Sequence, residues 1–225
     1  MADFARYLPL SQRPHRDERG VTSDRRTPTA TVLGAIAAAL RSGGETGWTT
    51  PTDDGATVAD AVARLVAGFD RPPARRAFDT AQHALGIEAR TAVPAAPVEG
   101  AADAAAALDV RAALITERPQ PTRIVELDDA VVAAILIGDA LGTAIVIPPI
   151  ASGAVALRRA AAAPTPIRAV ISGHSLHATD ASWTIGHGPV LVGTAHELLR
   201  FLAGIGSQAP RRPRDGELGS TDDPA

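Results

Sequence analysis

The sequence predicts a mainly α-helical protein, with a helical bundle over residues 29–163 and a small α/β domain over residues 164–205. The composition is the first observation: 45% of the residues are hydrophobic but only 3% are aromatic, and Ala-rich runs favour closely packed helices. Helix start and stop signals recur through the first of these regions. After the Pro-Thr-Pro of residues 164–166, β-branched residues indicate short strands instead.

The first expected helix covers residues 29–41 and ends at Gly43-Gly44, because glycine commonly stops helices. A second helix is expected from Thr57, which has the spacing of a capping box with Asp60. Its apolar positions recur at helical spacing and comprise Val58, Ala61, Val62, Leu65 and Val66.

The rest of the chain is expected to form further helices and two short strands. Helices are expected over residues 72–85, 101–118, 122–142, 151–162 and 194–202, and strands over 167–173 and 181–188 with 174–180 connecting them. The polar, Arg-rich ends, residues 1–28 and 206–225, are expected to be disordered.

Composition excludes several classes of function. The absence of Cys removes disulfides and thiolate metal sites, and the absence of Lys removes Schiff-base chemistry. A net charge of −3 gives no reason to expect a nucleic-acid partner. Codons for Lys and Asn are A-rich, so the lack of both residues indicates a GC-rich, actinobacterial type of genome.

No apolar run reaches the length of a membrane span, and residues 1–20 lack the apolar core of a signal peptide. We therefore expect a cytoplasmic protein without a membrane partner. The Ala-rich helices also allow close packing between subunits, so a homo-oligomer is one expectation.

Three carboxylates lie near the start of the apolar segment 122–142. Asp128 and Asp129 are expected to face the solvent, where negative charge suits the start of a helix. Glu126 lies near the border of the apolar face, with Arg123 one turn earlier, and a carboxylate in that position needs a partner.

Histidines gather near the C-terminal end of the chain. His174, His177 and His187 fall in strand or turn segments, with Asp180 and His196 nearby. We interpret them as solvent-facing turn residues, and a metal or acid–base site is the alternative.

Three segments together resemble the mycothiol-dependent maleylpyruvate isomerase family, part of the DinB-like metalloenzyme superfamily. GWTTPTDDGATVADAVARL (residues 47–65) is similar to the family's Trp-containing turn and the helix that follows it. TRIVEL (residues 122–127) resembles its R-x-x-E helix, and residues 181–205 resemble its small C-terminal α/β domain, where G-x-G-P leads into a Leu-rich helix.

The resemblance implies a DinB-like four-helix bundle that holds a divalent metal such as zinc through two His and one Glu, and uses mycothiol. Carried onto this chain, the metal-site positions are Arg64, Glu126 and Ala130. Arg64 stays protonated and Ala130 has no donor atom, so we expect a lost metal site and no bound metal.

If Arg64 occupies the place of the first ligand, its guanidinium is expected to pair with Glu126 across the bundle. Arg123, Trp48 and His83 are further candidates for lining a pocket. Of these three residues, His83 could in principle replace a missing metal ligand.

Three functions remain open from the sequence. The first is a non-catalytic small-molecule-binding or regulatory protein, whose ligand is a small molecule or thiol. An active mycothiol-dependent isomerase or thiol transferase with displaced ligands is the second, and a structural homo-oligomer of Ala-rich helices is the third.

Overall fold

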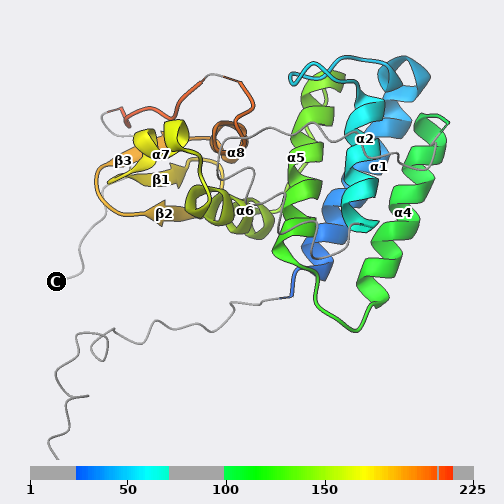
Figure 1. Ribbon diagram of the computed structural model, residues 1–225, viewed down its shortest axis with the longest axis horizontal. Helices are drawn as coiled ribbons and strands as arrows, with labels where there is room; N and C mark the ends of the chain where they lie inside the picture. The colour runs from blue at the N-terminus through cyan, green and yellow to red at the C-terminus, as the bar shows by residue number, and fades with distance from the viewer. Residues whose placement is uncertain (1–23, 71–98, 207, 215–225) are drawn as a thin grey trace, which may run out of the picture.

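The computed structural model describes residues 24–70, 99–206 and 208–214. These residues form a mainly helical structure with a small three-stranded sheet, which confirms the predicted fold class at that level. The elements are α1 (Arg26–Trp48), α2 (Val58–Asp70), α4 (Ala101–Glu117), α5 (Ile124–Leu141), α6 (Pro149–Ala161), α7 (Thr165–Ile171), β1 (Ser175–Ala178), β2 (Thr184–Gly186), β3 (Val190–Gly193) and α8 (Ala195–Ala203). Figure 1 shows α1, α2, α4 and α5 on one side of the molecule, and the sheet with α6, α7 and α8 on the other.

The two sides share one core. Helix α1 packs along α4 and α5, α2 packs on α5, and α5 also contacts α6 and α8. Leu33 and Leu127 from the long helices belong to the same buried cluster as Leu198 from α8. Helix α5 is therefore the element that connects the helical side to the sheet side.

Helix α1 extends beyond its predicted end. Gly44 has φ 56° and ψ −161°, so the predicted stop is a kink, after which helical turns continue to Trp48. A Cβ on Gly47 would lie 2.6 Å from Cδ2 of Leu141. This glycine lets the end of α1 pack closely against the end of α5.

The capping box that begins α2 is confirmed. The amide of Asp60 donates to Thr57 Oγ1 at 3.2 Å, and the amide of Thr57 donates to Asp60 Oδ2 at 3.0 Å. The helix predicted over residues 72–85 lies outside the described residues.

Helices α4, α5 and α6 form where the sequence predicts them, within two residues at each end. Helix α6 begins two residues early, at Pro149, because the fixed φ of proline suits a first helical turn. Within the described residues, no helix is both long and apolar enough to cross a membrane.

Residues 167–171, predicted as a strand, belong to helix α7. Pro164 precedes this helix and Pro166 is its second residue, positions in which proline favours helix initiation. Ile167 is buried while Val170 is 36% exposed, so only one side of the segment faces the core.

The predicted connection, residues 174–180, instead provides β1, the central strand of a sheet with the order β2-β1-β3. Strand β1 pairs antiparallel with β2 and parallel with β3. The strand predicted within residues 181–188 is confirmed as β2. The helix predicted over residues 194–202 forms as α8, and Thr194 and Glu197 cap its start.

Part of the segment predicted as a disordered tail contacts the sheet. Arg211 pairs with Val192 through two backbone hydrogen bonds of 2.7 and 3.2 Å. An edge strand leaves backbone groups unpaired, and this contact satisfies two of those on β3.

Candidate functional site

Glu126, the carboxylate at the predicted metal site, is held by an arginine of the preceding helix connection. Its side chain is only 7% exposed. Arg118 Nη2 donates to Glu126 Oε2 at 2.9 Å, and the backbone amide of Arg123 donates to the same oxygen at 3.3 Å. Arg118 follows α4 directly, so the pair joins the end of α4 to the start of α5.

The predicted pair between Arg64 and Glu126 is wrong. Arg64 Nη1 contacts Asp54 Oδ2 at 2.6 Å, and the Arg64 side chain is 52% exposed. Partial burial raises the pKa of Asp54, but hydrogen bonds from Arg64 and Thr52 outweigh it, and the net pKa is lowered. Arg64 therefore stabilises the turn before α2 and does not replace a metal in the core.

The remaining predicted positions do not complete a metal site either. Ala130 is fully buried and offers no donor atom. Arg123 is exposed at the N-cap of α5, and Trp48 is half-buried at the end of α1. His83 lies outside the described residues. Among the described residues, no group of three or more His, Cys, Asp or Glu is placed to hold a metal ion.

Asp128, predicted to face the solvent, is 5% exposed. Its two carboxylate oxygens accept hydrogen bonds from Arg158 Nε at 3.2 Å and Arg159 Nε at 2.6 Å. These arginines come from the last turn of α6, so Asp128 connects α5 to α6. The position is buried because α6 packs across the start of α5, a long-range contact that helical spacing alone does not reveal.

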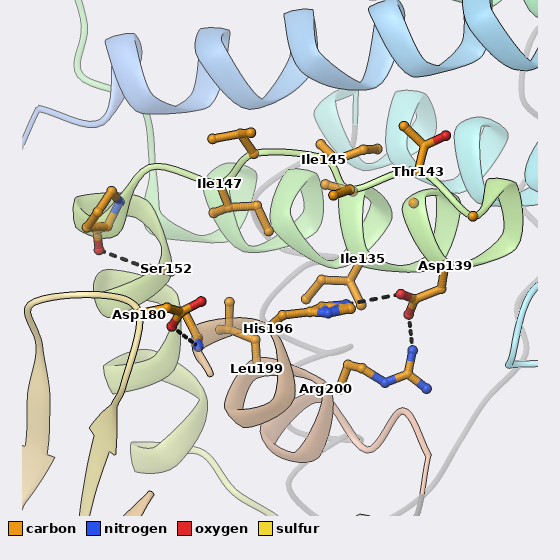
Figure 2. A pocket seen from close by; sticks show the side chains of 17 residues that line it. Ile135, Asp139, Thr143, Ile145, Ile147, Ser152, Asp180, His196, Leu199 and Arg200 are labelled. Carbon is orange, nitrogen blue, oxygen red and sulfur yellow. Dashed lines mark hydrogen bonds and ion pairs between the residues drawn. The ribbon is translucent and has the colours of Figure 1, made fainter. Parts of the chain in front are cut away.

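A cavity of about 820 Å³ lies at the other end of α5, between α5, α8 and the connection to α6. Its apolar wall consists of Ala134, Ile135, Ile145, Val146, Ile147, Ala195 and Leu199. Figure 2 shows the polar side chains Asp139, His196 and Arg200 grouped at one side of this wall. A concave, mostly apolar surface with a few convergent polar groups is the usual form of a small-molecule site.

Asp139 is the centre of the polar group. Its Oδ1 lies 3.1 Å from His196 Nε2, and its Oδ2 pairs with Arg200, which also pairs with Asp53 in the turn before α2. Asp139 is in the last turn of α5, where the helix dipole disfavours a negative charge. The cation of Arg200 offsets that cost and fixes the position of the carboxylate.

The chain reversal after α5 shapes the cavity. Gly142 has φ 60° and ends the helix, and the amide of Thr143 bonds to the carbonyl of Gly138 at 2.9 Å. This is the Schellman pattern of helix termination. A Cβ on Gly138 would lie 2.8 Å from Thr143 O and 3.4 Å from Ile145 Cγ1. Glycine at 138 is therefore needed for the connection to run back along α5.

The lining charges favour a particular ligand chemistry. Asp139 and Asp180 carry two negative charges against the single guanidinium of Arg200. Asp180 Oδ1 accepts from the amide of Ala195 at 2.6 Å, which caps α8. With His196 Nε2 on Asp139, the second ring nitrogen, Nδ1, remains as an acceptor in the neutral imidazole. The site suits an apolar molecule whose head donates hydrogen bonds or carries a positive charge.

The histidines of the sheet lie elsewhere. His177 Nδ1 is 2.8 Å from Thr184 Oγ1, and His174 Nδ1 is 3.1 Å from the carbonyl of Ser172. His174 and His187 line a second, smaller cavity, whereas His196 belongs to the larger one. The fold therefore separates His196 from His174 and His187, although all three were grouped by their proximity along the chain.

Sequence reasoning did not identify Asp139 and Arg200 as a pair, although an acidic residue inside the apolar segment 130–150 was visible. The signal is an aspartate three residues before the glycine that ends an otherwise apolar helix.

A comparison with models of protein families, with curated proteins and with solved structures gave no match.

Proposed function

We propose that this protein binds a small molecule in the cavity between α5 and α8, and that it is a maleylpyruvate isomerase or DinB-like protein that has lost its metal site. The observation that carries the binding proposal is the apolar cavity of about 820 Å³ with Asp139, His196 and Arg200 at one side.

The packing of α1, α2, α4 and α5 supports a DinB-like four-helix bundle, with the sheet and α8 as the appended C-terminal part. The metal that this family resemblance implies does not fit the corresponding residues. Arg64 is a cation paired with Asp54, Ala130 is a buried methyl group, and Glu126 is already paired with Arg118. One carboxylate alone does not form a zinc site.

The proposed ligand has a compact apolar body and one polar head. The apolar body would contact Ile135, Ile147 and Leu199, and burial of apolar surface would supply most of its affinity. The head would lie near His196 and the two carboxylates. We expect a hydroxyl or ammonium group there, because a carboxylate would face a net negative lining.

Three probes with the same six-carbon chain test this proposal: hexylamine, hexanol and hexanoate. We expect isothermal titration calorimetry to show one site per chain, with the amine bound at least as tightly as the alcohol and the acid weakest. Trp183 is a fluorescence reporter, because its Nε1 donates to Ser152 Oγ at 3.0 Å and Ser152 lines the cavity.

Ala144→Trp places a large side chain at an exposed lining position and should weaken binding at least tenfold, while Ala106→Trp on the exposed side of α4 is the matched control. Binding that is equal in both variants, absent for all three probes, or tightest for hexanoate would overturn the proposed site. Stoichiometric zinc that disappears in Glu126→Gln would overturn the lost metal site.

A further inference from the structure

A second cavity, of about 350 Å³, lies between the sheet and helices α6 and α7. Its walls include Leu157 from α6, Ile171 and Arg168 from α7, and two histidines, His174 and His187. None of the described residues that line it carries a carboxylate. It is separate from the cavity between α5 and α8, with which it shares no lining residue.

The two histidines lie next to the end of the pairing between β1 and β2. That pairing ends at Ser175 and Gly186, and His174 and His187 are the residues adjacent to this last pair. Both histidines line the same cavity as Leu176 and Ile185.

Glycines on both sides of His187 hold it against His174. A Cβ on Gly186 would lie 2.5 Å from the carbonyl oxygen of His174, and one on Gly188 would lie 2.1 Å from that of Gly173. Both glycines have positive φ, of 90° and 102°. The chain around His187 can therefore lie directly on the backbone of residues 173–175 only because these two positions lack side chains.

One ring is oriented in the way that metal-binding histidines usually are. His174 Nδ1 is 3.1 Å from the carbonyl of Ser172, to which it can only donate, so Nε2 carries the free lone pair. Metal ligands commonly donate their other ring N–H to a backbone carbonyl in this way. The glycines on both sides of His187 lie against the backbone of residues 173 and 174, and both histidines line one cavity, so their imidazoles can converge on one ion.

We propose that His174 and His187 bind one divalent transition-metal ion of the class that prefers imidazole, such as Zn²⁺, Ni²⁺ or Cu²⁺. Two protein ligands leave the other coordination positions to water or to a small anion. The guanidinium of Arg168 lines the same cavity and favours an ion that carries an anionic partner over a bare dication. The proposal is independent of the Glu126 region and of the cavity that contains His196.

Calorimetric titration of chelator-treated protein without an affinity tag tests the pair, with ZnCl₂ and NiCl₂ as the probes. We expect one ion per chain, and at least tenfold weaker binding in His174→Ala and in His187→Ala. His177→Ala is the matched control, because His177 lies in β1 three residues from His174, does not line this cavity, and contacts Thr184 instead. Its affinity should equal that of the unaltered protein.

Thermal unfolding provides a second measurement. An ion that binds only the folded chain raises the unfolding temperature, so 1 mM ZnCl₂ should stabilise the unaltered protein and His177→Ala but neither of the other variants. The unfolding temperature without metal shows whether each variant folds. If His187→Ala does not fold, His187→Gln replaces it. Equal zinc binding in all variants would overturn the proposal. The absence of zinc and nickel binding would overturn it as well, and phosphate binding that requires Arg168 would then indicate an anion site in this cavity.

Discussion

The two ends of α5 carry the same chemistry, carboxylates that face arginines, in different surroundings. At the first turns, the side chains of Glu126 and Asp128 are 7% and 8% exposed, and arginines from α6 and from the connection after α4 pair with them. At the last turn, the side chain of Asp139 is 23% exposed and borders a cavity.

This difference distinguishes carboxylates that stabilise the fold from a carboxylate that borders a cavity. Buried carboxylates must be paired, because removal of their partners leaves an uncompensated charge away from water. The pairs at the start of α5 therefore stabilise the contacts with α4 and α6. Asp139 and His196 keep access to a cavity, where a ligand can meet the unpaired ring nitrogen of the histidine.

The largest effect on stability is expected for Asp128→Ala. This change leaves Arg158 and Arg159 without their shared carboxylate and should lower the free energy of unfolding by about 3 kcal/mol. Asp139→Asn, at the opposite end of the same helix, is the control and should cost at most about 1 kcal/mol because that group is partly exposed. Urea unfolding measures both, and equal losses would remove the distinction between the two ends.

Glu126→Gln should lower the free energy of unfolding by about 2 kcal/mol, because Arg118 loses a charged partner in a mostly buried position. Arg64→Gln should change it by no more than about 0.5 kcal/mol, as expected for an exposed ion pair.

Double-mutant cycles measure which arginine is coupled to Glu126. The cycle with Arg118→Gln should show a coupling energy above about 0.5 kcal/mol, and the cycle with Arg64→Gln should be additive. The reverse result would restore the pairing of Arg64 with Glu126.

Gly138→Ala tests how the cavity end of α5 is built. The new methyl group would lie 2.8 Å from Thr143 O, so the connection after α5 must shift. We expect a loss of about 1–2 kcal/mol in stability and weaker hexylamine binding. Gly34→Ala in α1 is the control, because no atom lies within 4 Å of the added Cβ, and better helix propensity should stabilise it by up to about 1 kcal/mol. Unchanged binding in Gly138→Ala would show that the connection does not shape the site.

Asp60 is an exposed carboxylate at the start of α2, and its replacement has a small expected effect. Hydrogen bonds from the side chain and the backbone of Thr57 lower the pKa of Asp60 below its ordinary value of 3.8. Its contribution is therefore present above pH 3.8 and is lost as the pH falls through the lowered pKa. Asp60→Ala should cost about 0.5–1 kcal/mol at pH 7 and progressively less in acid. A difference that stays constant from pH 7 to pH 2 would contradict this assignment.

The errors in the sequence-based predictions have two causes, partners that come from distant elements and a local helix signal that was outweighed. The residues of TRIVEL and the carboxylates after it indicated a helix, and α5 forms there, but their partners Arg118, Arg158 and Arg159 belong to other elements. The apolar segment 167–171 was predicted as a strand from its β-branched residues. Its environment, with one side chain buried and proline in its first turn, selects a helix.

The sequence by itself determined the elements whose signals are local. Thr57 with Asp60, and Thr194 with Glu197, cap α2 and α8 through hydrogen bonds that span three residues, so residue spacing is sufficient to predict them.

Only the tertiary structure decided which charges are buried and where a cavity forms. Asp128 meets arginines 30 and 31 residues away, and Asp139 meets one 61 residues away. Contacts of this separation depend on how α5, α6 and α8 pack, because burial of apolar surface brings these helices together and the charged groups then pair within that arrangement.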